Sequence, residues 1–184
     1  MSGASAAAEL LKGYSAAGAT AEETGAVADV LLHISAHPDC LLRTCVTGHL
    51  TGSAWVISPD RSRVLLTHHL KLDKWLQLGG HADGDPDLRA VAEREAREES
   101  GLTHIRLLSE RLFDVDKHWI PARGQEPGHW HFDLRFAFEA DPADPLVVSS
   151  ESQSLAWVKL EDVAALNPEP SMTRMVRKSG ALRR

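Results

Sequence analysis

The chain has 184 residues, a net charge of −6 and two cysteines, and 43% of its residues are hydrophobic. This length accommodates one domain with a sizeable core, and the composition excludes an intrinsically disordered chain. The acidic balance argues against a nucleic-acid partner, because phosphate backbones need a basic surface. Two thiols make no disulfide framework, and no apolar run approaches the ~18 residues of a membrane span. We therefore expect a cytoplasmic protein without membrane contact.

The chain opens with two predicted helices, over residues 4–13 and 21–36. Thr20 and Glu23 have the spacing of a capping box at the start of the second helix, and the residue before Pro38 ends it. We treat residues 1–43 as an N-terminal helical extension and residues 44–184 as the domain proper. The extension is expected to cover an edge of that domain or to form a homodimer contact.

The remaining pattern predicts a mixed sheet. Apolar and alternating runs predict strands over residues 53–58, 63–69, 105–115, 129–139 and 155–160, and residues 161–166 and 170–179 predict helices. Residues 117–128, rich in proline and glycine, form a predicted loop of a length that is often functional. Because strands and helices follow one another without regular alternation, we expect an α/β fold with helices packed on a mixed sheet.

A predicted helix over residues 86–100 carries an unusual set of acids. Asp85 suits its cap, Pro86 its first position and Gly101 the position after its end. On a wheel of about 100° per residue, Glu95 and Glu99 fall within the apolar stripe, and Glu98 falls at its edge. The stripe itself is formed by Leu88, Val91, Ala92, Ala96 and Leu102.

Carboxylates on a packing face repel one another and lose hydration, and a bound divalent cation removes both penalties. Carboxylate oxygens suit Mg²⁺ or Mn²⁺ better than Zn²⁺. The alternative is a solvated helix in which Arg94 pairs with Glu98 and Arg97 with Glu93, but the wheel places the acids on the wrong side for it. Gly79 and Gly80 precede the helix, where glycine allows a ligand to approach the backbone.

These residues resemble the signature of the Nudix hydrolases, Gly-x5-Glu-x7-Arg-Glu-aliphatic-x-Glu-Glu-x-Gly-aliphatic. Gly80 opens the motif, and "REAREESGL", residues 94–102, closes it in register. Two positions depart, since Ala96 is smaller than the usual aliphatic residue and Pro86 replaces the first Glu. The resemblance covers roughly residues 46–166 and includes "ESQSLAWVKLEDV", residues 151–163, as the closing strand and helix of that fold.

The resemblance implies an α/β/α sandwich with a mixed sheet and Mg²⁺-dependent hydrolysis of a nucleoside diphosphate linked to another moiety. It implies that Glu95, Glu98 and Glu99 are metal ligands, that Arg94 orients them, and that the Gly79–Gly80 backbone approaches the substrate. Glu98 and Glu99, with Arg94, are the expected catalytic residues, and a loop acid such as Glu126 or Glu151 is the alternative proton acceptor. Either one of the aspartates 83, 85 and 87 replaces the missing Glu, or its role was local and Asp85 now caps the helix.

Histidines form the second candidate group. His129, His131 and Asp133 share one face of the strand over residues 129–139, and His81 follows the two glycines. We take His81, His129 and His131 as substrate-binding residues. Two alternatives stay open: a transition-metal site at His129, His131 and Asp133, and a polar face that points to solvent.

Two other functions share the same fold. Pro86 and Ala96 would suit a non-catalytic Nudix-fold module that binds a nucleotide or metal. An isomerase acting on a diphosphate is the third possibility, and it is disfavoured because neither cysteine lies near the expected site.

Overall fold

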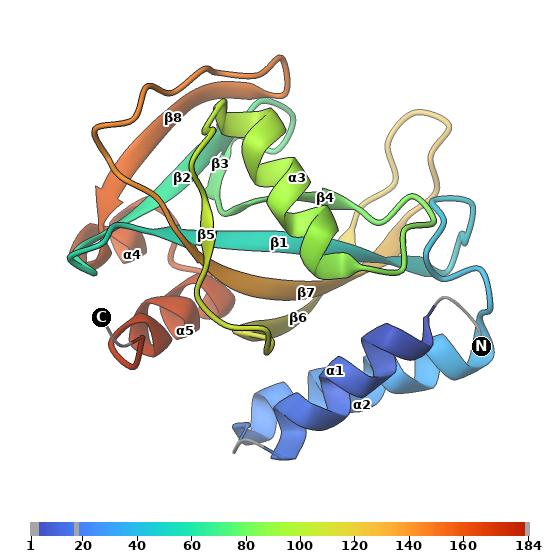
Figure 1. Ribbon diagram of the computed structural model, residues 1–184. Coiled ribbons are helices and arrows are strands. Elements are labelled where there is room, and N and C mark those ends of the chain that lie inside the picture. Colours follow the sequence, from blue (N-terminus) through green and yellow to red (C-terminus); the bar gives the residue numbers. More distant parts are fainter. Residues whose placement is uncertain (1–3, 17–18, 183–184) are drawn as a thin grey trace.

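Two long strands, β1 (Gly48–Ile57) and β7 (His129–Glu139), run parallel along their whole length and form the centre of the sheet. The computed structural model describes residues 4–16 and 19–182. The other strands pair antiparallel, so the sheet is mixed (Figure 1). They are β2 (Arg63–His69), β3 (Lys74–Leu76), β4 (Leu78–His81), β5 (Arg106–Leu107), β6 (Asp114–Ile120) and β8 (Ser152–Lys159).

The sheet curls because two strands share one edge of β1. Along the chain of paired strands the order is β3-β2-β1-β7-β5, with β4 also beside β1, β6 beside β7 and β8 beside β2. β2 pairs with β1 only at Val56 and Ile57, whereas β4 pairs with residues 51–54. β4 is therefore a short strand at the middle of β1, and the helix α3 (Leu88–Ser100) that follows it packs across both.

Alternate residues of β1 face different helices. A Cβ at Gly52 would lie 3.1 Å from Val91 Cγ1 on α3 (Leu88–Ser100), so the even positions of β1 face that helix. On the opposite side, Trp55 packs with Met172 and Met175 of α5 (Pro170–Ser179). A 3₁₀ turn (Leu160–Asp162) and α4 (Val163–Leu166) precede α5. The expected sandwich of helices on both faces of a mixed sheet is confirmed (Figure 1).

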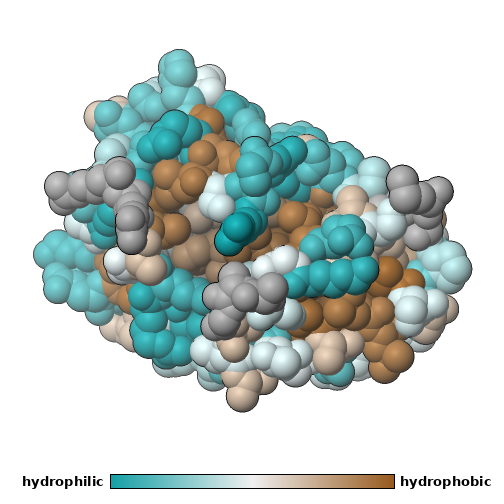
Figure 2. All heavy atoms as spheres, turned by 60° about the horizontal axis from the view of Figure 1, so that its bottom comes forward, coloured by the Kyte–Doolittle hydropathy of each residue, from teal (hydrophilic) through white to brown (hydrophobic). Residues whose placement is uncertain are grey.

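The N-terminal helices α1 (Ser5–Ala16) and α2 (Ala21–Ala36) form a hairpin. The expected capping box is present, since Thr20 Oγ1 accepts from the Glu23 amide and the Glu23 carboxylate accepts from the Thr20 amide. Val27 and Val30 belong to the same apolar cluster as the sheet residues that pack against α3. Leu32 of α2 is 69% exposed. Figure 2 shows hydrophobic surface on the side of the molecule that it brings forward.

None of the helices in the described ranges has the length and apolar character that a membrane span requires.

The predicted strand over residues 105–115 is wrong. Leu107 pairs with Phe138 and Asp114 pairs with Arg135, both on the same edge of β7, while residues 109–112 leave the ladder as a bulge. Three polar residues, Ser109, Glu110 and Arg111, occupy this bulge and are exposed. β6 then continues to Ile120, into the predicted loop, because its residues pair with β7 as far as His129.

A buried ionic network joins the hairpin to the sheet and to α5. Asp114, which is fully buried, accepts hydrogen bonds from Arg174 at 2.8 Å, from Arg135 at 3.1 Å and from Lys178 at 2.8 Å. Lys178 also contacts Glu23 of α2. Removing one partner from such a network leaves an uncompensated buried charge, which costs about 3–5 kcal/mol. The network therefore fixes how α2, α5 and β6 pack.

This network predicts acid sensitivity. Burial raises the pKa of Glu23, but hydrogen bonds from Lys178, Thr20 and Tyr14 outweigh it and lower the pKa from 4.5 to about 2. Stability that depends on ionised Glu23 is present above pH 4.5 and is lost as the pH falls towards 2. Urea unfolding between pH 2 and 6 should show a smaller loss of stability in Glu23→Gln than in the wild type. The exposed Glu9→Gln variant should behave like the wild type, and equal slopes in all three would contradict the assignment.

Candidate functional site

The acidic helix α3 lies against the backbone of β4. The Gly79 amide donates a hydrogen bond to Glu99 Oε2 at 3.1 Å, so the side chain of one element satisfies the backbone of the other. A Cβ at Gly80 would lie 2.5 Å from Glu95 Cδ, well inside van der Waals contact. Glycine at position 80 is therefore what lets the Glu95 carboxylate reach the strand. Gly79, Gly80, Glu95 and Glu99 form one corner, which we call the glycine–glutamate corner.

The three glutamates differ in burial as the helical wheel predicts, with two on the packed side of the helix and one at its edge. Glu99 is 7% exposed, Glu95 is partly buried and Glu98 is exposed. Burial raises the pKa of Glu99 to about 8, and the neighbouring Glu95 adds to the shift while the Gly79 amide opposes it. Burial also raises the pKa of Glu95, against the effect of Arg94. The fold thus holds two acids whose ionised forms are disfavoured by burial more than Arg94 and the Gly79 amide favour them.

Arg94 connects the glutamates to the loop before the helix. Its guanidinium lies 3.1 Å from Glu95 Oε1 and 3.6 Å from Asp85 Oδ2. The expected alternative pair between Arg94 and Glu98 does not form, whereas Arg97 pairs with Glu93 at 2.7 Å on the outer face. Arg94 therefore forms an ion pair with Glu95, the partly buried member of the three glutamates.

The helix starts two residues later than predicted. Asp87 is the N-cap, and its Oδ1 accepts from the Ala90 amide at 3.1 Å. Asp85 does not cap the helix, because its Oδ1 accepts from the Asp87 amide at 2.9 Å and closes the turn that leads into it. Pro86 thus precedes the helix. The C-terminal expectation is confirmed, since Gly101 is the C-cap with φ of 74°.

The two loop acids lie in different places. Glu151, in the segment before β8, is close enough to Glu95 and Glu99 to raise the pKa of both carboxyl groups. Glu126 instead lies beside the histidines, with its Oε1 4.0 Å from His129 Nε2. Of the two, Glu151 is the one that interacts with the two glutamates of the glycine–glutamate corner.

The corner fits a hard divalent cation. The side-chain atoms that it offers to a metal are carboxylate oxygens. Among the described residues, Glu99 accepts only one hydrogen bond, from the Gly79 amide. A buried carboxylate with so little compensation gains from a nearby positive charge. Oxygen ligands of this kind are the ones that Mg²⁺ and Mn²⁺ prefer. Glu95 and Glu99 are the residues of the corner that would hold such an ion. Glu98 stays the predicted third ligand, because the carboxylate oxygens of the three do not all lie within 4.8 Å of one another.

The histidines lie on the other face of the sheet. His81 pairs with Thr51 across β4 and β1, and His49 pairs with His131 across β1 and β7. These odd positions of β1 face away from α3. The ring centroids of His81 and His131 are 4.9 Å apart, and those of His129 and His131 are 5.1 Å apart. The expected substrate-binding residues therefore divide into the glycines at the corner and a separate histidine cluster.

The solvent-facing alternative for this strand face is wrong. His129 is 4% exposed and Asp133 is 1% exposed. Asp133 also does not join the histidines, because it accepts hydrogen bonds from Thr51, Ser53 and Arg135. His49, which no local sequence pattern singles out, takes the place predicted for Asp133 beside His129 and His131. Its place on the same face becomes evident only once β1 and β7 are known to be parallel neighbours.

These rings favour their neutral forms. Burial lowers the pKa of His81 to about 4, and the positive charge of Arg43 adds to this shift. Burial is also the main cause that lowers the pKa of His49 and of His131. Neutral imidazole has a free lone pair, which makes it a metal ligand rather than an anion-binding cation.

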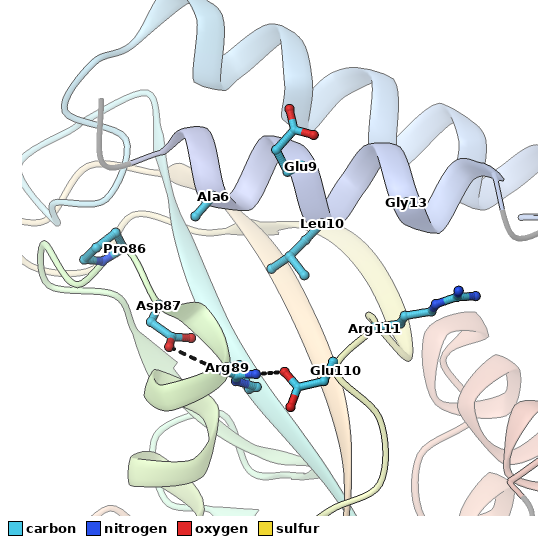
Figure 3. Close-up of a pocket in the computed structure, with 9 residues that line it drawn as sticks. All are labelled: Ala6, Glu9, Leu10, Gly13, Pro86, Asp87, Arg89, Glu110 and Arg111. Atoms are coloured by element: carbon cyan, nitrogen blue, oxygen red, sulfur yellow. Dashed lines mark hydrogen bonds and ion pairs between the residues drawn. The ribbon is translucent and has the colours of Figure 1, made fainter. Parts of the chain in front are cut away.

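A separate surface hollow of about 570 Å³ lies between α1 and the start of α3 (Figure 3). Its lining includes Leu10 of α1, Pro86, and Arg89, which forms an ion pair with Glu110. None of the residues of the glycine–glutamate corner or of the histidine cluster lines it. Pro86, the position that breaks the family pattern, therefore faces this hollow.

Comparisons with known proteins identify the fold and the family of the chain. The family model of the NUDIX domain matches residues 49–178. A Caenorhabditis elegans Ap4A hydrolase superposes with a TM-score of 0.58 at 20% identity, covering 72% of this chain and 95% of that one. A NUDIX-family hydrolase from Clostridium perfringens gives 0.53 at 24% identity, covering 73% and 98%.

An Escherichia coli dihydroneopterin triphosphate pyrophosphohydrolase gives a TM-score of 0.57 at 16% identity, covering 70% of this chain and 92% of that one. No curated protein matches the sequence. At these identities the solved structures establish the fold, and the match of the family model carries the family relationship.

The close approach at Gly80 predicts a selective defect. In Gly80→Ala the new methyl group meets the end of a flexible side chain, so the chain should fold while Glu95 is pushed from the strand. We expect Mn²⁺ affinity measured by calorimetry to fall at least about tenfold, with a small change in melting temperature. Gly25→Ala is the control, because a Cβ there meets nothing within 4 Å, and it should raise stability by about 0.5–1 kcal/mol. Unchanged Mn²⁺ affinity in Gly80→Ala would contradict this reading.

Proposed function

The chain belongs to the NUDIX domain family of hydrolases that act on acid anhydrides, and from this premise we propose that it is a Mg²⁺-dependent hydrolase of a nucleoside diphosphate linked to another moiety. The observation that carries the proposal is the burial of Glu99 and Glu95 against the glycine backbone of β4. Without a compensating cation, the desolvation of these carboxylates would lower the stability of the fold, and no other interaction of the corner would require them.

We assign the cation to Glu95, Glu98 and Glu99, with Mn²⁺ as a substitute for Mg²⁺. Arg94 is a positioning residue, because it contacts Glu95 and Asp85. When bound, a divalent cation supplies electrostatic stabilisation of diphosphate oxygens and makes water more acidic. Asp85 takes over a local role near the missing first Glu, since it holds both the turn before α3 and the Arg94 guanidinium.

The reaction is the addition of water across a phosphoanhydride. A water oxygen attacks one phosphorus, the bond from that phosphorus to the bridging oxygen breaks, and the bridging oxygen leaves with the second phosphate. A carboxylate accepts the proton of the attacking water. Glu98, which is exposed at the edge of the set, and Glu151, which interacts with Glu95 and Glu99, are the two candidates.

The substrate contacts are assigned to β4. Gly79 and Gly80 present backbone at the corner, and His81 follows directly on the same strand. His131 contacts the His81 ring of this strand, and His129 lies beside His131. The similar structures include hydrolases named for a dinucleoside tetraphosphate and for a pterin triphosphate, so the shared fold supports the anhydride chemistry and leaves the organic moiety to be found by assay.

The decisive comparison is release of phosphate or mononucleotide from a panel of nucleoside diphosphate derivatives in the presence of Mg²⁺. Glu98→Gln and Glu99→Gln should lower kcat at least about 100-fold, because each removes a charge that holds the cation or accepts a proton. Glu93→Gln is the matched control on the outer face of the same helix, where it loses only the pair with Arg97, and it should stay within about twofold of the wild type.

Wild-type activity in Glu98→Gln and Glu99→Gln would overturn the proposal, and so would the absence of hydrolysis of every diphosphate while Mg²⁺ is bound. Tight binding of Mn²⁺ and a nucleotide without turnover would instead favour the non-catalytic module.

A further inference from the structure

The histidine cluster is built on strands at the end of the sheet where β1 and β7 begin. His49 lies directly beside His131 in the parallel register, and His129 is two residues earlier on the same face of β7. The three ring centroids are 4.8 to 5.1 Å apart. One nitrogen from each ring lies within 4.8 Å of the other two. Strand positions hold such side chains more firmly than loops do.

His49 lacks what a buried polar side chain normally has. It is 2% exposed, and neither its Nδ1 nor its Nε2 forms a hydrogen bond with any residue in the described part of the chain. The Cys45 carbonyl, which accepts from the Gly48 amide at 3.1 Å, lies near the ring but outside hydrogen-bonding geometry. Buried polar side chains are nearly always paired, and an unpaired one calls for a missing ligand or ion. The ring of His49 packs against His81, His129 and His131, so that ligand would lie among imidazoles.

His129 is already oriented as a ligand. Its Nδ1 lies 2.9 Å from the Pro127 carbonyl oxygen, and a carbonyl only accepts, so Nδ1 carries the proton. In the neutral ring the lone pair is then on Nε2, which accepts a hydrogen bond from His131 Nε2 at 3.2 Å, and a bound cation would take the place of that shared proton. Metal-binding histidines commonly have this arrangement, in which a backbone carbonyl fixes the tautomer and the opposite nitrogen binds the ion.

The chemistry of the ligand follows from the donors. Adjacent buried imidazoles cannot all be protonated, because burial and mutual repulsion both disfavour the charged form. An anion such as phosphate needs the charged rings, whereas a metal ion needs the neutral ones. Imidazole nitrogens suit first-row transition metals, and Mg²⁺ prefers oxygen. A cation here would therefore differ in kind from the one assigned to the glutamates.

We propose that His49, His129 and His131 bind a first-row transition-metal ion of the Zn²⁺ class, on the face of the sheet opposite α3. A tetrahedral zinc ion with Zn–N bonds of about 2.0–2.1 Å places its nitrogens about 3.3 Å apart. The Nε2 atoms of His129 and His131 are 3.2 Å apart, close to this spacing, and His49 offers a ring nitrogen within 4.8 Å of both residues' ligand atoms. Three histidines leave one coordination position, which His81 or Glu126 borders.

The test is metal titration of untagged, metal-free protein. Co²⁺ should give the intense visible absorption of tetrahedral nitrogen ligation and saturate at one equivalent, and Zn²⁺ should displace it. His49→Asn and His131→Asn should lower the Zn²⁺ affinity at least about 100-fold, measured by competition with a chromogenic chelator. His104→Asn is the control, because its side chain is 85% exposed, and it should bind Zn²⁺ like the wild type.

The inference stands apart from the proposed hydrolase activity. Glu99→Gln should keep the full Zn²⁺ affinity, so failure of one site is distinguishable from failure of the other. If a histidine variant does not fold by circular dichroism, the wild type still decides the question: Zn²⁺ should raise its melting temperature, and the Co²⁺ spectrum should be tetrahedral. The proposal is overturned by the absence of stoichiometric binding, by wild-type affinity in folded His49→Asn and His131→Asn, or by an octahedral Co²⁺ spectrum. Binding of inorganic pyrophosphate that His131→Asn abolishes, in a protein that takes up no Zn²⁺, would overturn it as well.

Discussion

The approach of two carboxylates to a bare strand backbone is the constraint on which the site depends. Glu99 accepts a hydrogen bond from the Gly79 amide, and Glu95 occupies the space that any side chain at position 80 would fill. This geometry needs glycine in β4, a helix that starts at the right residue, and the Arg94 contact that holds Glu95. Burial raises the pKa of Glu99, because the protein alone compensates its negative charge poorly. A cation at the corner would supply the missing positive charge.

The two faces of the central strands carry different kinds of side chain, with carboxylates over one face and imidazoles on the other. The even positions of β1 pack on α3, whose acids offer oxygen ligands, while the odd positions carry His49 and the polar residues around Asp133. β4 connects them, because Gly80 faces the glutamates and the next residue, His81, faces the histidines. Substrate bound along β4 would therefore lie between a hard-cation site and an imidazole cluster. The buried network around Asp114 keeps β6, α5 and the N-terminal hairpin fixed around this arrangement.

The sequence predicts the features that depend on the spacing of residues within one helix or strand. The strand over residues 129–139, the helix over residues 21–36 with its capping box, and the burial order of Glu95, Glu98 and Glu99 all follow from the period of one element. The helix start was misplaced because Asp85 and Asp87 are both good caps, and only the turn that Asp85 closes decides between them. The strand over residues 105–115 failed because a polar bulge interrupts a ladder whose two halves pair with the same strand. His49 was missed because its neighbours come from strand order, which no local pattern contains.

The measurement that tests the account most directly is anomalous diffraction from crystals grown with Mn²⁺. The account predicts an anomalous peak bounded by the carboxylates of Glu95, Glu98 and Glu99, beside the Gly80 backbone. A peak found only among His49, His129 and His131, or no ordered Mn²⁺ at the glutamates at saturating concentration, would contradict it.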